Sequence, residues 1–161
     1  MNKTKICNTL EVLRWVGFGL GIFFAQSLGQ DPIEKLNLFS IWAVISIAGL
    51  TGLESVFLAD TAAKKSGYGS GSPYQRQSGF NNLALALTTA LAHFLSWGIY
   101  ANAALLTALL IFLTLSAANH AYSAFKENNR EIRNFLRPLM TIFLLLYSIP
   151  FILSALKFTG R

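Results

Sequence analysis

Long apolar stretches alternate with short polar connections along this chain of 161 residues. Five stretches approach the roughly 20 apolar residues that a helix needs to cross a bilayer, and they cover 10–28, 38–59, 80–99, 101–125 and 138–156. Because a backbone inside lipid must satisfy its own hydrogen bonds, we expect helices for all five. The pattern predicts an all-α, polytopic membrane helix bundle with about five transmembrane helices, forming a single integral membrane domain over 1–161. Four spans plus an interfacial helix is the alternative.

The longest polar interruption is the segment 64–79, which is rich in glycine, serine, glutamine and tyrosine. We expect it to form a loop on the cytoplasmic side. Glycine lets the backbone turn tightly and approach a ligand or another segment, which favours an ordered loop lining a cavity. A flexible linker between two helices is the alternative. The segment therefore marks the region where a functional site is expected.

Composition agrees with a membrane protein, since 53% of the residues are hydrophobic and 12% are charged. Soluble domains carry about 25% charged residues. The net charge of +6 does not require a nucleic-acid partner, because the position of Lys and Arg matters more in a membrane protein. Ten of the 13 basic residues lie before or near the start of the first stretch, in the central loop or between the last two stretches. This asymmetry predicts a cytoplasmic N-terminus and a C-terminus outside.

The first stretch also resembles the hydrophobic part of a signal peptide. Phe24 stands where a cleavage site needs a small residue, so we expect the stretch to be retained as a span.

Polar residues inside the apolar stretches indicate a pocket in the cytoplasmic half of the bundle. Glu54 lies about ten residues before Lys64, or roughly 15 Å along a helix, and a carboxylate at that depth tends to face a cavity or a partner. A structural hydrogen bond of Glu54 is an equally weighted alternative. Ser116, Asn119 and His120 recur at helical spacing and share one face at a similar depth. The candidate residues for binding a substrate or ion are Glu54, Arg76, Asn81, Asn82, Asn119 and His120, followed by Tyr68, Tyr74, Gln75, Gln77 and Ser116.

Metal and cofactor sites are not predicted. Cys7 is the single cysteine, and His93 lies far in depth from His120, so no usual set of metal ligands arises. Two pairs of glycines, Gly17 with Gly21 and Gly49 with Gly52, allow close helix approach. They predict packing within the chain, with a homo-oligomer contact as the alternative.

Glu54 and the segment 67–84 also carry a resemblance. The segment begins Gly67-Tyr68-Gly69 and includes Phe80-Asn81-Asn82. Together these residues resemble the signature region of small prokaryotic polytopic membrane proteins that form a family of unknown function. The resemblance implies the prokaryotic inner membrane as the location and the lipid bilayer as the surroundings. It implies no activity and no catalytic residue.

Three functions are compatible with these residues. The favoured hypothesis is a transporter or channel for a small solute or ion, or a proton-coupled carrier, with its polar cavity in the cytoplasmic half. The alternative is a structural or accessory subunit that binds other membrane proteins. An enzyme acting on a lipid, with Glu54 or His120 as acid or base, is less favoured because paired carboxylates and a nucleophile motif are missing from the sequence.

Overall fold

The computed structural model describes residues 2–69 and 73–160, and within them it contains helices and no strand. The all-α prediction is therefore confirmed. The helices are α1 (Lys3–Leu28), α2 (Pro32–Val44), the π-helix η1 (Ile45–Gly49), α3 (Leu50–Phe57), α4 (Ala59–Lys65), α5 (Pro73–Phe94), α6 (Ile99–Lys126) and α7 (Ile132–Thr159).

Four helical segments are long and apolar enough to cross a membrane among the described residues. They are α1, α6, α7 and the continuous rod Pro32–Phe57 that α2, η1 and α3 form together. By length and composition, these four segments are consistent with an integral membrane protein. The sequence predicted about five spans, and the difference is α5, a helix of 22 residues. Its first turns carry Gln75, Arg76 and Gln77, which lower its apolar character below that of the other four.

Helices α1 and α2 begin earlier than predicted because polar side chains cap them. The Asn2 side chain accepts a hydrogen bond from the backbone N–H of Thr4 at 3.0 Å, so α1 starts at Lys3. The Asp31 carboxylate accepts from the N–H groups of Ile33 and Glu34 at 2.8 and 2.9 Å. Such caps satisfy the free N–H groups of a first helical turn. The polar ends of the helices therefore continue beyond the apolar stretches.

The predicted loop over 64–79 is partly wrong. Helix α4 continues to Lys65, and α5 already begins at Pro73, so residues 74–79 are helical. Residues 70–72 of the predicted loop lie outside the described residues. Proline suits the first position of a helix because its missing N–H would have no helical partner there. This early start gives the polar residues of the segment fixed helical positions.

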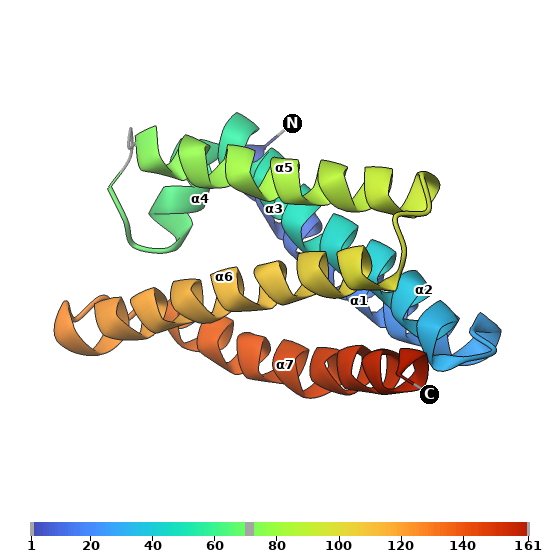
Figure 1. Cartoon of the computed structure of the whole chain (residues 1–161). Coiled ribbons are helices and arrows are strands. Elements are labelled where there is room, and N and C mark those ends of the chain that lie inside the picture. Colours follow the sequence, from blue (N-terminus) through green and yellow to red (C-terminus); the bar gives the residue numbers. More distant parts are fainter. Residues whose placement is uncertain (1, 70–72, 161) are drawn as a thin grey trace.

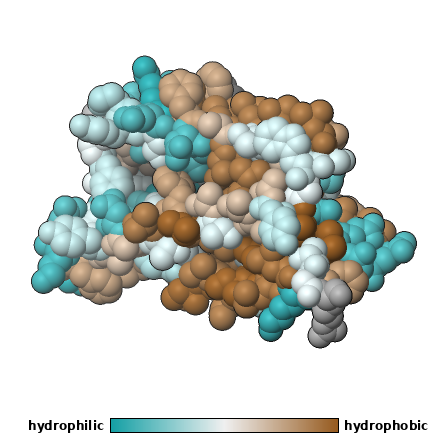
Figure 2. Space-filling view, viewed as in Figure 1, coloured by the Kyte–Doolittle hydropathy of each residue, from teal (hydrophilic) through white to brown (hydrophobic). Residues whose placement is uncertain are grey.

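The helices are arranged with two distinct ends (Figure 1). The α4 end holds α4, the start of α5 and the α6–α7 turn, on the left in Figure 1. The opposite end holds the α1–α2 turn, the α5–α6 turn and the C-terminus. Helix α3 packs against α5, and α6 packs against α7. Hydrophilic residues gather toward the two ends of the surface, and hydrophobic residues dominate between them (Figure 2).

Small residues let the helices approach closely inside the chain. A Cβ atom on Gly17 would lie 2.3 Å from Cβ of Ser46 in η1, and one on Gly79 would lie 2.8 Å from Cβ of Ser55 in α3. Gly21 meets the backbone of α2, and Gly52 meets Leu83 of α5. These contacts explain the glycine pairs by packing within the chain. The homo-oligomer contact stays a prediction.

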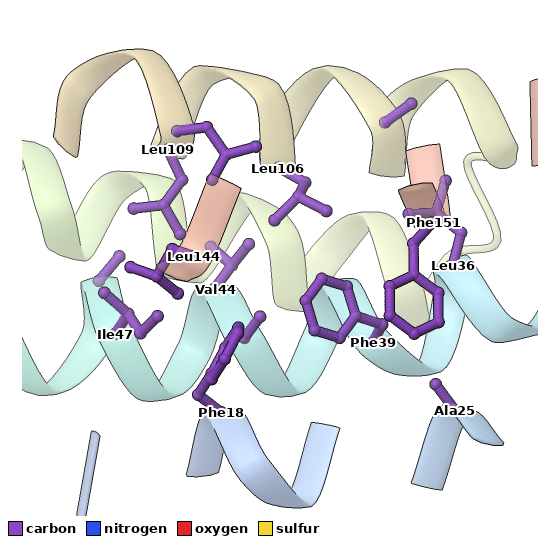
Figure 3. Close-up of a cluster of buried hydrophobic side chains, with 14 of the residues drawn as sticks. Phe18, Ala25, Leu36, Phe39, Val44, Ile47, Leu106, Leu109, Leu144 and Phe151 are labelled. Atoms are coloured by element: carbon purple, nitrogen blue, oxygen red, sulfur yellow. The ribbon is translucent and has the colours of Figure 1, made fainter. Parts of the chain in front are cut away.

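The apolar core draws its side chains mainly from α1, α2, η1, α6 and α7 (Figure 3). Its members near the α1–α2 turn, among them Leu36 and Phe39, lie in the half away from α4. The rings of Phe39 and Phe151 stack with their centroids 4.5 Å apart, and Phe18 meets Phe39 edge to face at 5.7 Å. Leu36 and Leu106 are fully buried beside them. This half of the bundle is closed by aromatic and aliphatic side chains.

Candidate functional site

A cavity of about 320 Å³ lies at the α4 end of the bundle. Its walls come from α1, η1, α3, α4, α5, α6 and α7. Polar and charged groups form much of the lining, and they are Glu11, Arg14, Thr51, Glu54, Ser55, Ser66, Tyr68, Gln75, Ser78, Asn82, Ser116, Asn119, His120, Arg133, Arg137 and Thr141. Thus all the long helical segments contribute to one site.

One wall of the cavity is a buried ion pair between α1 and α3. Arg14 donates from Nη2 to Oε2 of Glu54, and their side chains are 13% and 6% exposed. The same Nη2 lies 3.5 Å from the carbonyl oxygen of Leu50. The Nε atom of Arg14 is buried and has no hydrogen-bond partner among residues 2–69 and 73–160. Because burial removes water from both charges, each depends on the other for compensation.

A second acidic group, Glu11, ties three elements together. Its Oε2 accepts from Nη2 of Arg133 at 2.5 Å and lies 3.8 Å from Nζ of Lys65. Nζ of Lys65 also donates to Oδ1 of Asn8. Burial lowers the pKa of the Lys65 ammonium group, and the positive charge of Arg133 lowers it further. This network fixes α4 against the first turns of α1 and α7.

His120 stands at the centre of a third network, and its partners define its tautomer. Nη1 of Arg137 lies 2.5 Å from Nε2 of His120. Because a guanidinium only donates, Nε2 must carry a lone pair. The proton is therefore on Nδ1, which donates to Oδ1 of Asn134 at 2.8 Å. We infer a neutral imidazole from this pattern of donors and acceptors.

Asn134 and Tyr68 complete the network around the imidazole. Nδ2 of Asn134 donates to the carbonyl oxygens of Asn129 and Ser66 at 3.1 and 3.3 Å, which leaves its Oδ1 as the acceptor for His120. The hydroxyl oxygen of Tyr68 lies 3.0 Å from Nδ1 of His120 and shares that proton. No acceptor for the hydroxyl hydrogen of Tyr68 is found in the described part of the chain, so this hydrogen can be donated to a ligand in the cavity.

Arg137 differs from the other two arginines of the cavity. Arg14 pairs with Glu54, and Arg133 pairs with Glu11. Within residues 2–69 and 73–160, Arg137 forms no ion pair, and its one hydrogen bond goes to the neutral His120. Most of its five N–H donors therefore remain available toward the cavity.

The structure brings seven of the eleven predicted residues to the cavity. Glu54, Asn82 and His120 are buried in its lining, and Asn119 contributes to the lining although it is exposed. The lower-ranked residues in the lining are Tyr68, Gln75 and Ser116. Nε2 of Gln75 donates to Oγ of Ser55 at 3.1 Å.

The other four predicted residues do not line the cavity. They are exposed on the outer side of α5, and they are Tyr74, Arg76, Gln77 and Asn81. The reason is the early start of α5 at Pro73. Residues 75, 78 and 82 follow helical spacing and share the inner face, so their neighbours in sequence point outward. Treating 64–79 as a loop hid this division.

Sequence reasoning missed the basic residues of the cavity. Arg14, Arg133 and Arg137 were not among the candidate residues, because the basic residues were used only to orient the chain. A signal was present, because Asn134, Arg137 and Thr141 recur at helical spacing and share one face. Their polar character at the start of an apolar helix indicates a common function for that face.

A metal site finds no support in the geometry. Among the described residues, no three His, Cys, Asp or Glu side chains lie together as a metal ion would require. Hydrogen-bond donors dominate the part of the cavity around Arg137 and His120. The chemistry that this arrangement offers is recognition of a polar or charged group.

These features define the class of the protein as a helical integral membrane protein with a charged cavity at one end of its bundle. The family of unknown function DUF6790 matches residues 5–159. The chain therefore belongs to this family, in line with the resemblance to an uncharacterised family. Comparison with curated proteins and with solved structures found no match. The prokaryotic source and the signature region remain predictions.

Proposed function

We propose that this protein is a transporter or channel that binds a small polar solute in the cavity at the α4 end. The observation that carries the proposal is the cavity itself, which holds about 320 Å³ and is lined by charged and polar side chains. Ligand pockets typically measure about 300–1,000 Å³, so the space suits a small solute.

The charges of the cavity support binding over a purely structural role. Ionisable groups within membrane helices are costly and usually mark the path of a substrate or ion. The pair of Arg14 and Glu54 lies in helices that cross the membrane, and both groups line the cavity. An accessory subunit that only packs against partners would gain nothing from a hollow, charged interior. The cavity therefore counts against the accessory alternative.

The two ends of the bundle also support a transport cycle. The α4 end is hollow, while the stack of Phe39 and Phe151 closes the opposite half. A carrier exposes its site to one side of the membrane at a time. We propose that this arrangement is the state in which the α4 side is open and the opposite side is closed. The predicted cytoplasmic N-terminus would make the open side cytoplasmic.

Flux through proteoliposomes tests the proposal. The purified chain is reconstituted on a solid-supported membrane, and currents are recorded after concentration jumps of potassium phosphate, sodium acetate and potassium chloride. We expect protein-dependent currents for at least one of these salts and a loss of at least tenfold in Glu54→Gln. Glu127→Gln is the matched control because Glu127 is exposed at the end of α6 and lies outside the lining.

Two results would contradict the proposed function. Currents equal to those of empty liposomes for every salt would argue against transport of small ions. Equal currents in Glu54→Gln and in the native chain would remove Glu54 from the path. The double variant Arg14→Gln with Glu54→Gln keeps a neutral pair, so it separates loss of the negative charge from loss of folding.

A further inference from the structure

We infer that the cavity binds an oxyanion, a phosphate or carboxylate group, on the guanidinium of Arg137. This inference rests on the proposed function, because it names the class of solute for the same cavity. Three observations carry it: the charge balance of the lining, the free donors of Arg137 and the neutral state of His120.

The lining carries more positive than negative charge. Among the described residues it contains three arginines and two glutamates. Each glutamate already pairs with an arginine, and Glu11 also attracts Lys65 from outside the lining. Arg137 is therefore the arginine of the lining that forms no ion pair among the described residues, and Glu54 and Glu11 act on its charge only from a distance. A bound anion would supply the missing charge.

The donors of Arg137 match an oxyanion in geometry. Its Nη1 is engaged with His120, which leaves the edge formed by Nε and Nη2 without a partner among the described residues. This edge presents two parallel N–H groups, and such a fork binds two oxygens of one carboxylate or phosphate. A spherical anion such as chloride would not use both donors equally well.

The surroundings hold Arg137 in place for this role. His120 accepts from Nη1 of Arg137 and is itself fixed by Asn134, whose two N–H groups bind backbone carbonyls. Because the imidazole accepts through a lone pair, it orients the guanidinium without cancelling its charge. A carboxylate in the place of His120 would orient Arg137 and neutralise it. The choice of residue leaves the cation available for a ligand.

Arg137 also lies at a position where an uncompensated cation is costly. It lies five residues after the start of α7, or roughly 8 Å along the helix, within a segment long and apolar enough to span the membrane. A cation at such a place is costly unless a partner compensates it. In the same cavity the hydroxyl hydrogen of Tyr68 offers a further donor.

Binding of inorganic phosphate to the full chain tests the inference. The protein is purified in detergent, and its thermal unfolding is followed in potassium phosphate and in potassium chloride at equal ionic strength, with acetate as the carboxylate probe. We expect phosphate or acetate to raise the unfolding temperature in a saturable manner, and chloride to have a much smaller effect. Isothermal titration calorimetry then gives the affinity.

Variants of Arg137 decide whether the anion occupies the proposed place. We expect Arg137→Gln to weaken binding at least tenfold and Arg137→Lys, which keeps the charge but loses the fork, to weaken it less. Arg76→Gln is the matched control, since Arg76 is exposed and lies outside the lining. Circular dichroism checks that each variant is folded, and Arg137→Lys provides the test if Arg137→Gln does not fold.

Nanodiscs distinguish a free anion from a lipid headgroup. Stabilisation by phosphate or acetate in phosphatidylcholine nanodiscs would identify a free anion as the ligand. Stabilisation by phosphatidylglycerol in the nanodisc, lost in Arg137→Gln, would identify a headgroup. The inference is overturned if phosphate, acetate and phosphatidylglycerol all fail to stabilise the chain beyond chloride, or if Arg137→Gln binds as tightly as the native chain.

The outcomes also separate this inference from the proposed function. Phosphate binding at Arg137 without any current in proteoliposomes would uphold the anion site and refute transport. Currents that depend on Glu54 without any oxyanion binding would uphold transport and refute the anion site.

Discussion

The two halves of this bundle are built from the same helices but in opposite ways. At the opposite end, α1, α2, α6 and α7 meet through Phe18, Phe39, Leu106 and Phe151, which are buried against each other. At the α4 end α1, α6 and α7 meet α3, which continues the rod of α2, through ion pairs and hydrogen bonds around a cavity. The contacts thus change from apolar to polar along the length of the long helical segments.

The π-helix η1 lies where the two halves join. It spans Ile45–Gly49, between the buried Val44 of the core and the stretch of α3 that carries Glu54. A π-helical turn adds a residue to the helical repeat and is frequent at functional sites. Here Oγ of Ser46 donates to the carbonyl oxygen of Trp42 at 2.6 Å, which also accepts from the backbone N–H of Ile45. Glu54 follows η1 by five residues and lines the cavity.

In a membrane, the loss of an apolar packing contact and the loss of a polar contact have different free-energy costs. Apolar side chains leave the core for lipid at little cost, because lipid is as apolar as the core, so only packing contacts are lost. A buried charge that loses its partner is stabilised neither by the protein nor by lipid, so its loss of compensation costs much more free energy. The α4 end should therefore be the more sensitive half to single substitutions.

The largest effect is expected from breaking the ion pair at the α4 end. Glu54→Leu leaves Arg14 buried without its partner, and we expect a loss of about 3–5 kcal/mol in the free energy of unfolding. The double variant Arg14→Leu with Glu54→Leu should recover most of that loss, because no charge then remains uncompensated. Unfolding titrations in mixed micelles with increasing dodecyl sulfate measure both. Equal stability of the single and double variants would refute the compensation argument.

A smaller effect is expected from the core of the opposite end. Phe39→Ala removes the ring that stacks on Phe151, and in soluble cores such a change costs about 3–5 kcal/mol. We expect a loss of about 2 kcal/mol here, because the Phe39 ring would contact lipid and not water in the unfolded state. The same unfolding titration measures it. Phosphate binding should be unchanged, and weakened binding would show that the two halves are coupled.

The fold could be predicted largely from the sequence because lipid imposes a strong constraint on it. The all-α class and four long apolar helices followed from the need for apolar, self-bonded segments. The fifth predicted span corresponds to the helix α5, whose polar first turns make it less apolar than the four candidate spans. The loop over 64–79 was predicted too long, since glycine, serine and glutamine indicate a loop by composition while Pro73 begins a helix.

The candidate site was predicted only where helical spacing was visible. Glu54 and the face of Ser116, Asn119 and His120 were found by their unusual place in apolar stretches, and they do line one cavity. The arginines were not found, because contacts between α1, α3 and α7 depend on tertiary packing. Arg14 meets Glu54 across 40 positions of the chain, and no local pattern encodes such a pairing.

We expect the α4 end to unfold locally before the rest of the bundle. Asn134→Ala removes the acceptor of His120 and two hydrogen bonds to the carbonyl oxygens of Ser66 and Asn129. Because these bonds lie at one end, we expect a global loss of about 1 kcal/mol with faster hydrogen exchange in α4 and in the α6–α7 turn. Exchange in α2 should stay unchanged, and Asn119→Ala at the exposed part of the lining is the control. Faster exchange throughout the bundle would show that the two halves fold as one cooperative unit.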